Sequence, residues 1–285
     1  MLTNIKSLLF KILLIFFVIL SAKANEQLSS FISNLIPGEG LTETSIQLDE
    51  DKNPDLEILV VRDIDSTDDS NLFSQFSLHT QEINSFSREI LNLGFGSRKL
   101  IQDKSLMYGF NAFWDNDFEA GHNRASIGFE LKGSMLDFNA NSYHALTGHE
   151  EYKGVQEQVL SGYTIELASQ IPYSPWAKIN WQNYMWDNEK SAENTEGNTL
   201  ALEAYVTPSL QLIVKNDFSD NTGVDDELSY KLAYFYPPRQ TISMQNGFSD
   251  IAFEKENVEK KLKEKVRREN NLTVEVQGSV VITSK

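Results

Sequence analysis

Few residues of this chain are spaced as a chemical site requires. Ser142 and His144 stand two positions apart and so share one face of a strand, and a serine beside a histidine can form a nucleophilic pair. An activated serine also needs a third group that orients the histidine, and the sequence has no convincing Asn or Asp pattern for that role. We therefore expect the polar end of a strand here and no enzymatic activity.

Two acidic segments could hold a cation. His149 with Glu150 and Glu151 could bind a metal loosely, but the chain has only 4 histidines and a solvated loop is the simpler interpretation. The other segment lacks the glycine and the distal glutamate of a calcium loop, so we expect a periplasmic turn. Its carboxylates are Asp63, Asp65, Asp68 and Asp69. With no cysteine and no glycine-rich phosphate loop, the sequence predicts no metal and no cofactor.

Composition excludes one large class of function. The chain has 285 residues, with 25 Lys and Arg against 41 Asp and Glu, which gives a formal net charge of −16. Nucleic-acid binding needs a basic face for the phosphates, so this class is excluded. Hydrophobic residues make up 40% and aromatic residues 11% of the chain, which is typical of a folded protein and not of a disordered one.

The first 24 residues have the features of an export signal. Lys6 and Lys11 lie in or beside the apolar run 8–20, and Ala-Lys-Ala at 22–24 places small residues where a signal peptidase cleaves. The alternative is an uncleaved anchor, but the run is shorter than the ~20 residues that span a bilayer. The sequence therefore predicts a signal peptide over 1–24 and an exported protein.

Alternation with a period of two recurs from residue 43 to residue 236. Leu106, Phe110 and Trp114 share one parity and Asn111 and Asp115 share the other, so one face is apolar and one is polar. Several segments reach the ~9–11 residues that cross a bilayer at a tilt. The pattern predicts about twelve strands, over 43–48, 55–63, 71–80, 89–98, 104–114, 122–132, 134–144, 160–170, 174–185, 198–207, 209–218 and 227–236.

From residue 115 to residue 226, the connections between these strands alternate in length. Tight turns fall at Gly133, 171–173 and Pro208. Outer-membrane barrels have tight periplasmic turns and long outer loops, and they close because an unpaired sheet edge is not tolerated in lipid. The alternation therefore predicts an all-β, closed antiparallel transmembrane barrel over 43–236, with a soluble periplasmic β-protein as the weaker alternative. The long polar links are 115–121, 145–159, 186–197 and 219–226.

Desolvation decides which face of the barrel meets lipid. An Arg or Lys that faces lipid at mid-depth costs roughly 2–4 kcal/mol. The polar parity carries six acidic and six basic residues, so this face must line a wet lumen in which the charges can pair. These residues are Glu57, Arg98, Arg124, Glu130, Lys132, Asp137, Glu166, Lys178, Glu203, Lys215, Asp217 and Lys231.

Ordered motifs resemble a known family. The block 93–98 (Leu-Gly-Phe-Gly-Ser-Arg) and the blocks 108–118, 121–130, 139–143 and 146–148 resemble the β-domain of inverse autotransporters, the intimin and invasin family. The similarity extends over about 26–236. It implies a twelve-stranded barrel in the lipid of the cell outer membrane, preceded by a short periplasmic helix within 25–42. The class also implies assembly by the general barrel-insertion machinery.

Residues 237–285 follow a last strand that ends on the periplasmic side, because the number of strands is even. In the family this segment turns back into the pore. Apolar spacing predicts a helix over 251–268, for which an exposed periplasmic helix is the alternative, and 267–271 resembles the Arg-Asn-Asn linker of the family. The residues assigned to the pore helix and linker are Lys261, Lys265, Arg267, Arg268, Asn270 and Asn271.

The resemblance implies a translocation or anchor barrel, here without an adhesive passenger, because the sequence stops at Lys285, where the passenger would begin. The passenger was lost or is encoded separately, or the chain is a fragment. The alternative function is a structural or small-solute pore with no role in secretion. No residue pattern specifies a ligand or a partner at the cell surface.

Overall fold

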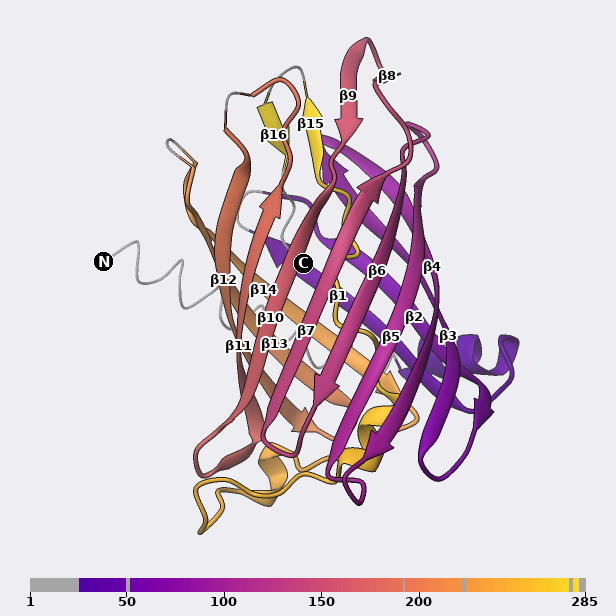
Figure 1. Cartoon of the computed structure of the whole chain (residues 1–285), viewed down its shortest axis with the longest axis vertical. Helices are drawn as coiled ribbons and strands as arrows, with labels where there is room; N and C mark the ends of the chain where they lie inside the picture. Colours follow the sequence, from indigo (N-terminus) through magenta and orange to yellow (C-terminus); the bar gives the residue numbers. More distant parts are fainter. Residues whose placement is uncertain (1–25, 50–51, 192, 222–223, 277–278, 282–285) are drawn as a thin grey trace.

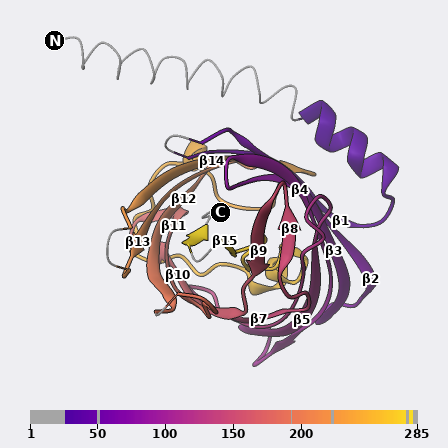
Figure 2. The ribbon, with the colours of Figure 1, turned by 90° about the horizontal axis from the view of Figure 1, so that it is seen from above.

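The computed structural model describes residues 26–49, 52–191, 193–221, 224–276 and 279–281. The predicted signal peptide, 1–24, lies outside the described residues. Antiparallel strands form a tall closed cylinder, and the C-terminal part of the chain runs through it (Figure 1). Seen from above, the strands make a complete ring, and a helix lies outside the wall (Figure 2).

Twelve strands close the barrel in the order β1-β14-β13-β12-β11-β10-β7-β6-β5-β4-β3-β2. Closure joins the first strand to the last, where Thr42 pairs with Tyr236 and Asp49 with Ser229. Every neighbouring pair is antiparallel, so the prediction of a twelve-stranded antiparallel barrel is confirmed. The strands are β1 (Gly40–Asp49), β2 (Asp55–Ser66), β3 (Ser70–Ile83), β4 (Phe86–Ile101), β5 (Leu106–Asp117), β6 (Asn123–Lys132), β7 (Leu136–Ala145), β10 (Gly162–Ile171), β11 (Ser174–Trp186), β12 (Thr195–Thr207), β13 (Leu210–Ser219) and β14 (Glu227–Tyr236).

The alternation of residue types places apolar side chains outside and charged ones inside. Phe95 and Ile127 are 63% and 62% exposed on the outer wall, whereas Arg98 and Arg124 are 1% and 0% exposed. Inverting this order would put charges in hydrocarbon and apolar groups in a wet lumen. The local pattern of each strand therefore fixes the face that it turns to lipid.

The two rims of the barrel differ. One, which we call the turn rim, has the short connections 67–69, 102–105, 133–135, 172–173 and 208–209. The other, the loop rim, has longer connections between β5 and β6, β7 and β10, β11 and β12, and β13 and β14, as the predicted alternation required, but only two residues, 84–85, join β3 to β4 there. By the rule for outer-membrane barrels, the turn rim is periplasmic and the loop rim is external. β1 begins and β14 ends at the turn rim.

The connection between β7 and β10, which we expected to be a polar loop, contains a hairpin. It is formed by β8 (Glu150–Tyr152) and β9 (Val155–Val159). Two strands from the C-terminal part complete a four-stranded sheet at the loop rim, β15 (Val274–Val276) and β16 (Ser279–Val281). Strands of three to five residues are too short to give an alternation pattern, so the sequence did not show this sheet.

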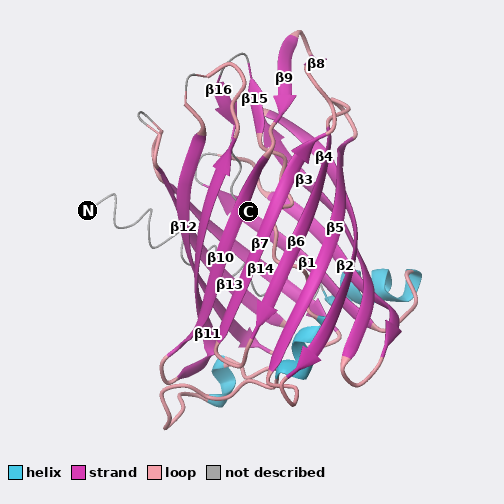
Figure 3. Ribbon diagram, viewed as in Figure 1, coloured by secondary structure: helices cyan, strands magenta, loops and turns pink. Residues whose placement is uncertain are grey.

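Helical segments are few (Figure 3). The expected N-terminal helix covers 26–35, and the barrel begins at Gly40 instead of residue 43. Two 3-10 turns follow the barrel, η1 (Met244–Asn246) and η2 (Val258–Lys263). Among the described residues, no helix is both long and apolar enough to cross a membrane.

The predicted helix over 251–268 is wrong, because only η2 is helical in that range. The carbonyl of Leu262 accepts hydrogen bonds from Arg98 and Asn71, and the N–H of Val266 donates to Gln75. Side chains of the barrel wall therefore take the backbone groups that a longer helix would have to pair internally. The chain becomes extended after Lys263.

Candidate functional site

The candidate site is the pore together with the chain that passes through it. We call residues 237–281 the tail and residues 264–273 the threaded segment. The tail first follows the turn rim, where the Tyr173 N–H donates to the Ala252 carbonyl at 2.8 Å and Trp176 Nε1 donates to the Gly247 carbonyl at 3.0 Å. It then enters the lumen and reaches the sheet at the loop rim (Figure 1). The tail therefore joins the two rims.

Lys261 attaches the tail to the barrel wall at the entrance of the pore. Its side chain is 1% exposed, and Nζ donates to Asp137 Oδ1 at 2.6 Å and to the Gly133 carbonyl at 2.7 Å. Glu256 accepts from it at 3.1 Å and also pairs with Lys178. An apolar cluster beside these charges consists of Leu100, Met107, Val258 and Leu262. The entrance thus combines buried charge pairing with apolar packing.

Arg98 links the wall to the tail just above the entrance. Its Nε donates to Glu130 at 2.8 Å, while Nη1 donates to the carbonyls of Leu262, at 3.0 Å, and Glu264. Both ends of the guanidinium are therefore used, one on the wall and one on the tail backbone.

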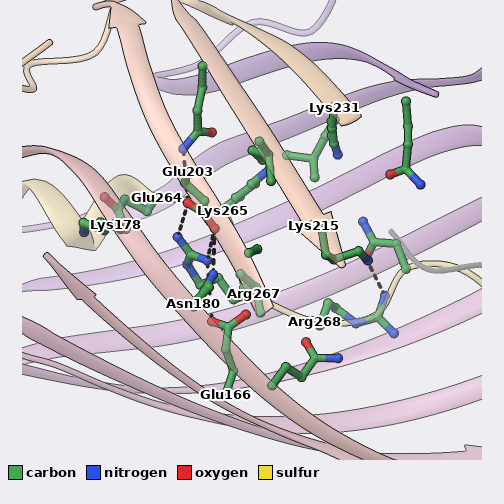
Figure 4. A pocket seen from close by; sticks show the side chains of 18 of the residues that line it. Glu166, Lys178, Asn180, Glu203, Lys215, Lys231, Glu264, Lys265, Arg267 and Arg268 are labelled. Atoms are coloured by element: carbon green, nitrogen blue, oxygen red, sulfur yellow. Dashed lines mark hydrogen bonds and ion pairs between the residues drawn. The ribbon is translucent and has the colours of Figure 1, made fainter. Parts of the chain in front are cut away.

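Arg267 reaches the opposite part of the wall. Its two terminal nitrogens each donate to a Glu203 oxygen at 2.7 Å, and Nη1 lies 3.6 Å from Glu166 (Figure 4). The two parallel bonds to one carboxylate fix the direction of the side chain as well as its position. Because Asn180 and Gln211 also donate to Glu203, this carboxylate has a full set of partners.

Asp115 holds two arginines from different parts of the chain. Arg268 of the threaded segment donates to its oxygens at 2.9 and 2.7 Å, and Arg124 of β6 donates at 2.9 Å. The Arg268 guanidinium also lies 4.3 Å from the centre of the Phe113 ring. All three charged side chains are fully buried. One buried carboxylate therefore joins β5, β6 and the tail.

The position of the Phe113 ring depends on a glycine of the Leu-Gly-Phe-Gly-Ser-Arg block. A Cβ at Gly94 would lie 2.3 Å from the Phe113 ring, closer than any side chain tolerates. The missing side chain therefore leaves room for the ring on which Arg268 stacks. This gives a physical reason for one glycine of the motif.

Amide side chains of the wall pair the backbone of the threaded segment. Gln81 is the clearest case, because its oxygen accepts from the Leu272 N–H at 2.9 Å and its nitrogen donates to the Leu272 carbonyl at 2.7 Å. Asn141 and Asn92 donate to the carbonyls of Arg267 and Asn270, both at 3.1 Å. An extended chain without sheet neighbours is thus satisfied in the middle of the pore.

The tail leaves the lumen as a strand. β15 pairs with β9, and the Leu160 N–H donates to the Thr273 carbonyl at 2.9 Å. Apolar packing supports the pairing, through Ile83, Ile90, Val159, Leu272, Val274 and Val276. The hairpin itself is held down by Arg88, which donates to both oxygens of Glu157 at 2.7 and 2.6 Å.

Glu275 provides a second attachment at the exit. Its carboxylate accepts from the backbone N–H groups of Glu189, Lys190 and Ser191, at 3.0 to 3.2 Å. Partial burial by itself would raise the pKa of this carboxyl, but the three donors hold the pKa below its ordinary value. The loop between β11 and β12 therefore binds the Glu275 carboxylate of the tail in its ionised form.

The threaded segment leaves part of the lumen open. A cavity of about 140 Å³ lies between it and the wall formed by β10 to β14, β1 and β2 (Figure 4). Basic and acidic groups both line it, Lys215 and Lys231 among them, and Lys231 donates to Glu57 at 2.8 Å. Among the described residues, no group of three or more His, Asp or Glu side chains could hold a metal ion.

Every residue that the sequence assigned to the lumen lies on the inner wall or in the tail. Lys265 pairs with Glu43 at 2.7 Å, and Asn271 is 2% exposed. By contrast, Ser142 and His144 lie outside, with Oγ and Nε2 3.3 Å apart. Wall residues assigned earlier are Arg98, Arg124, Glu130, Asp137, Glu166, Lys178, Glu203, Lys215 and Lys231, and tail residues are Lys261, Lys265, Arg267, Arg268, Asn270 and Asn271.

Sequence reasoning missed the polar but uncharged part of the site. The amides of Gln75, Gln81, Asn92 and Asn141 share the lumen parity of the charges, which is the pattern that could have found them. The contact of Glu275 with a distant loop has no counterpart in local sequence.

Comparisons with known proteins agree with this architecture. A family model described as the inverse autotransporter β-domain matches residues 17–270. Intimin of Escherichia coli O111:H- is 28% identical over 161 residues, which is 53% of this chain and 17% of intimin. Invasin of Yersinia enterocolitica is 32% identical over 117 residues, 39% of this chain and 13% of invasin. The inverse autotransporter adhesin YeeJ of E. coli K12 aligns with 91% of this chain at 22% identity.

These relatives are much longer than the part that they share with this chain. The alignment with YeeJ covers 11% of that protein. A solved structure from a study of the in-meso crystallization of membrane proteins matches with a TM-score of 0.67 and 19% identity, over 83% of this chain and 100% of its own. An outer membrane channel from Pseudomonas putida F1 matches with a TM-score of 0.52 and 10% identity, over 70% and 96%. At these identities the two structures show a common fold alone.

Proposed function

We propose a display function from one premise: the chain belongs to the inverse autotransporter β-domain family and is an outer-membrane barrel of the intimin and invasin type. In this proposal, the barrel anchors its own tail across the outer membrane and presents the external end of the tail at the cell surface. The pore serves as the path and the holder of that tail.

One observation carries the proposal. The threaded segment is bound along its whole length, through side chains at Arg267 and Arg268 and through its backbone at Leu272. A pore for solutes would gain nothing from such a segment, because the segment occupies the lumen and pairs groups that would otherwise contact passing solute. A barrel that holds an external segment needs the threaded segment, because the threaded segment connects the wall to that external segment.

We propose that the barrel is not an enzyme. Ser142 and His144 contact each other on the outer wall, but within the described part of the chain no carboxylate or amide is hydrogen-bonded to His144. A serine without an oriented base is a weak nucleophile.

Adhesion belongs to the proposal only indirectly. The word adhesin describes YeeJ as a whole protein, and 11% of its length is shared with this chain. We therefore propose a holder for an adhesive or other surface segment, whether that segment is joined to the chain or supplied separately. Assembly by the general barrel-insertion machinery is proposed on the same basis of class.

Conductance in planar bilayers tests the proposal. We expect the protein with its tail to pass little current and a variant that ends at Tyr236 to form a wide, steady channel. Heat-modifiable migration of both forms on a gel, the usual sign of a folded barrel, controls for folding. Equal currents with and without the tail would instead favour the alternative, a small-solute or structural pore.

A further inference from the structure

The N-terminal helix, residues 26–35, lies on the outer wall of the barrel (Figure 2). Ser29 Oγ is 2.8 Å from Thr44 Oγ1 of β1, and both residues are buried. Arg62 of β2 donates to Ser33 Oγ at 3.3 Å and to the Ile36 carbonyl at 2.8 Å. The helix therefore covers β1 and β2 beside the seam at which β1 meets β14.

The wall beneath this helix is polar where a lipid-facing wall should be apolar. Thr42, Thr44 and Arg62 have the outward parity, since their neighbours Glu43 and Val61 point into the lumen. They are nevertheless 0%, 2% and 7% exposed. In hydrocarbon, such hydroxyls and a guanidinium would be unfavourable without partners.

Arg62 shows how completely the patch is satisfied. Besides its two bonds to the helix region, the guanidinium donates to the carbonyls of Leu41 and Val61, at 2.9 and 2.8 Å, and to Thr42 Oγ1 at 3.0 Å. A cation on the outer wall is thus enclosed by oxygen atoms of the helix and the wall.

The helix has three kinds of face. Small and polar residues, with Ile32, pack against the wall. Leu28, Phe31 and Leu35, at positions i, i+3 and i+7, form one exposed stripe, and they are 42%, 60% and 64% exposed. Beside this stripe, Gln27 and Asn34 are also exposed. A helix whose outer faces contact only water is not expected to expose such an apolar stripe.

Its depth points to the membrane interface. Thr42 and Thr44, which the helix region covers, pair with Tyr236 and Tyr234, and Tyr236 ends β14 at the turn rim. Tyrosines gather at the level of the lipid headgroups. On the same wall, Ile64 near the turn-rim end of β2 is 55% exposed. The helix and its stripe therefore lie at the turn-rim end of the wall, where the outer wall also exposes an apolar side chain.

We propose that this helix is an interfacial anchor, seated in the periplasmic leaflet of the outer membrane. Leu28, Phe31 and Leu35 enter the acyl chains of that leaflet, while Gln27 and Asn34 face the periplasm. The helix replaces lipid over the polar patch at the closing seam, with its hydroxyls inward and its apolar stripe outward. This location is more specific than the periplasmic lead helix that the family resemblance implied.

Absence of cysteine from the chain allows a direct test. Single variants Phe31→Cys, Leu35→Cys and Asn34→Cys receive a nitroxide label and are placed in vesicles of phosphatidylethanolamine and phosphatidylglycerol. Collision of each label with oxygen, which dissolves in lipid, is compared with collision with a water-soluble nickel complex. All three side chains are exposed, so the labels should not disturb folding.

We expect the labels at 31 and 35 to favour oxygen over nickel severalfold relative to the label at 34. If all three favour nickel, the helix lies in water and the proposal is wrong. If the labels at 31 and 35 are shielded from both reagents, protein covers the stripe, for instance a second copy, and the lipid is not the occupant.

A charge on the stripe gives an independent readout. Phe31→Asp should lower the midpoint of heat-modifiable unfolding in vesicles by several degrees, whereas Asn34→Asp should leave it unchanged. Because the Phe31 ring is largely free of the wall, a helix that only packs on the barrel would leave both midpoints unchanged, which would overturn the proposal. Neither result depends on the tail or on the proposed display function.

Discussion

Asp115 is the residue on which the pore contacts converge. It accepts from Arg124 of the wall and from Arg268 of the threaded segment, and all three side chains are buried. Removal of the carboxylate leaves two cations facing each other, whereas removal of Arg268 leaves Asp115 still paired with Arg124. The two substitutions should therefore differ in cost, although each breaks the same ion pair.

We predict that Asp115→Asn lowers the free energy of unfolding by about 3–5 kcal/mol, as for other broken buried pairs. Arg268→Gln should cost about 1–3 kcal/mol, the range for loss of a buried hydrogen-bond partner. Urea unfolding of the refolded barrel measures both. Lys104→Gln is the control, because its pair with Glu259 is exposed on both sides and should be worth about 0–1 kcal/mol. Equal costs at positions 115 and 268 would contradict the shared-carboxylate arrangement.

Glu119, in the loop after β5, gives a pH dependence outside the membrane-spanning strands. Burial and a hydrogen bond with Glu89 raise the pKa of Glu119 from an ordinary 4.5 to about 7. Between these values the folded state binds more protons than the unfolded chain, so folding is favoured by low pH. This contribution is fully present below about pH 4.5 and is lost as pH rises through 7.

We predict that Glu119→Gln removes this decline. Because the carboxyl is mostly exposed, the difference between wild type and variant should change by no more than about 1 kcal/mol between pH 5 and pH 8. Unfolding free energies in detergent at several pH values measure it, with Glu151→Gln in the hairpin as the matched control. A variant that loses as much stability as wild type over this range would show that Glu119 does not titrate there.

At the scale of elements, β4 shapes the channel for the tail. Gly94 faces the lumen, and its missing side chain makes room for the Phe113 ring on which Arg268 stacks. The strand thus has two roles, since its outward face meets lipid and its inward face determines where an aromatic ring and a cation lie.

We predict that Gly94→Ala destabilises the protein by about 1–3 kcal/mol, the usual cost of overpacking. Phe113→Leu in the same chain should recover part of the loss, because the smaller side chain vacates the contested space. Gly148→Ala is the control, since a Cβ there would meet nothing within 4 Å. Thermal unfolding followed by gel migration reports all three variants. No loss in Gly94→Ala would mean that the ring has space to move.

Elements differed in how far local sequence determined them. All twelve barrel strands could be predicted. Each strand meets lipid on one face and a wet lumen on the other, so apolar and polar residues alternate along it. The conformation of the tail could not be predicted from local sequence, because its extended form depends on Gln75, Arg98 and other wall residues that are distant in sequence. Apolar spacing alone favoured a helix over 251–268, and tertiary contacts overrode it.

The candidate site shows the same division. Charged residues of the lumen were found because a charge on a membrane strand has only one tolerable direction. Their partners were not found, because the pairing of Arg267 with Glu203 or of Glu275 with the loop at 189–191 joins segments that are far apart in sequence. The strands β8, β9, β15 and β16 exist only as partners of one another, so none could be recognised alone.

For the whole molecule, the tail connects the two rims of the barrel. Lys261 fixes it at the turn rim, the threaded segment pairs with the wall, and β15 joins β9 at the loop rim. Contacts at three depths oppose both withdrawal and further sliding of the tail. An outer-membrane barrel with this internal strap is suited to hold an external segment in place.

The most direct test of this account is which side of the membrane each end of the tail reaches. Two single-cysteine variants, Ser279→Cys in β16 and Phe248→Cys below the turn rim, are exposed to a maleimide that does not cross the outer membrane. We predict that position 279 is labelled in intact cells and position 248 is labelled only after the outer membrane is permeabilised. Labelling of position 279 only after permeabilisation would mean that the tail does not thread the pore, and the account would fail.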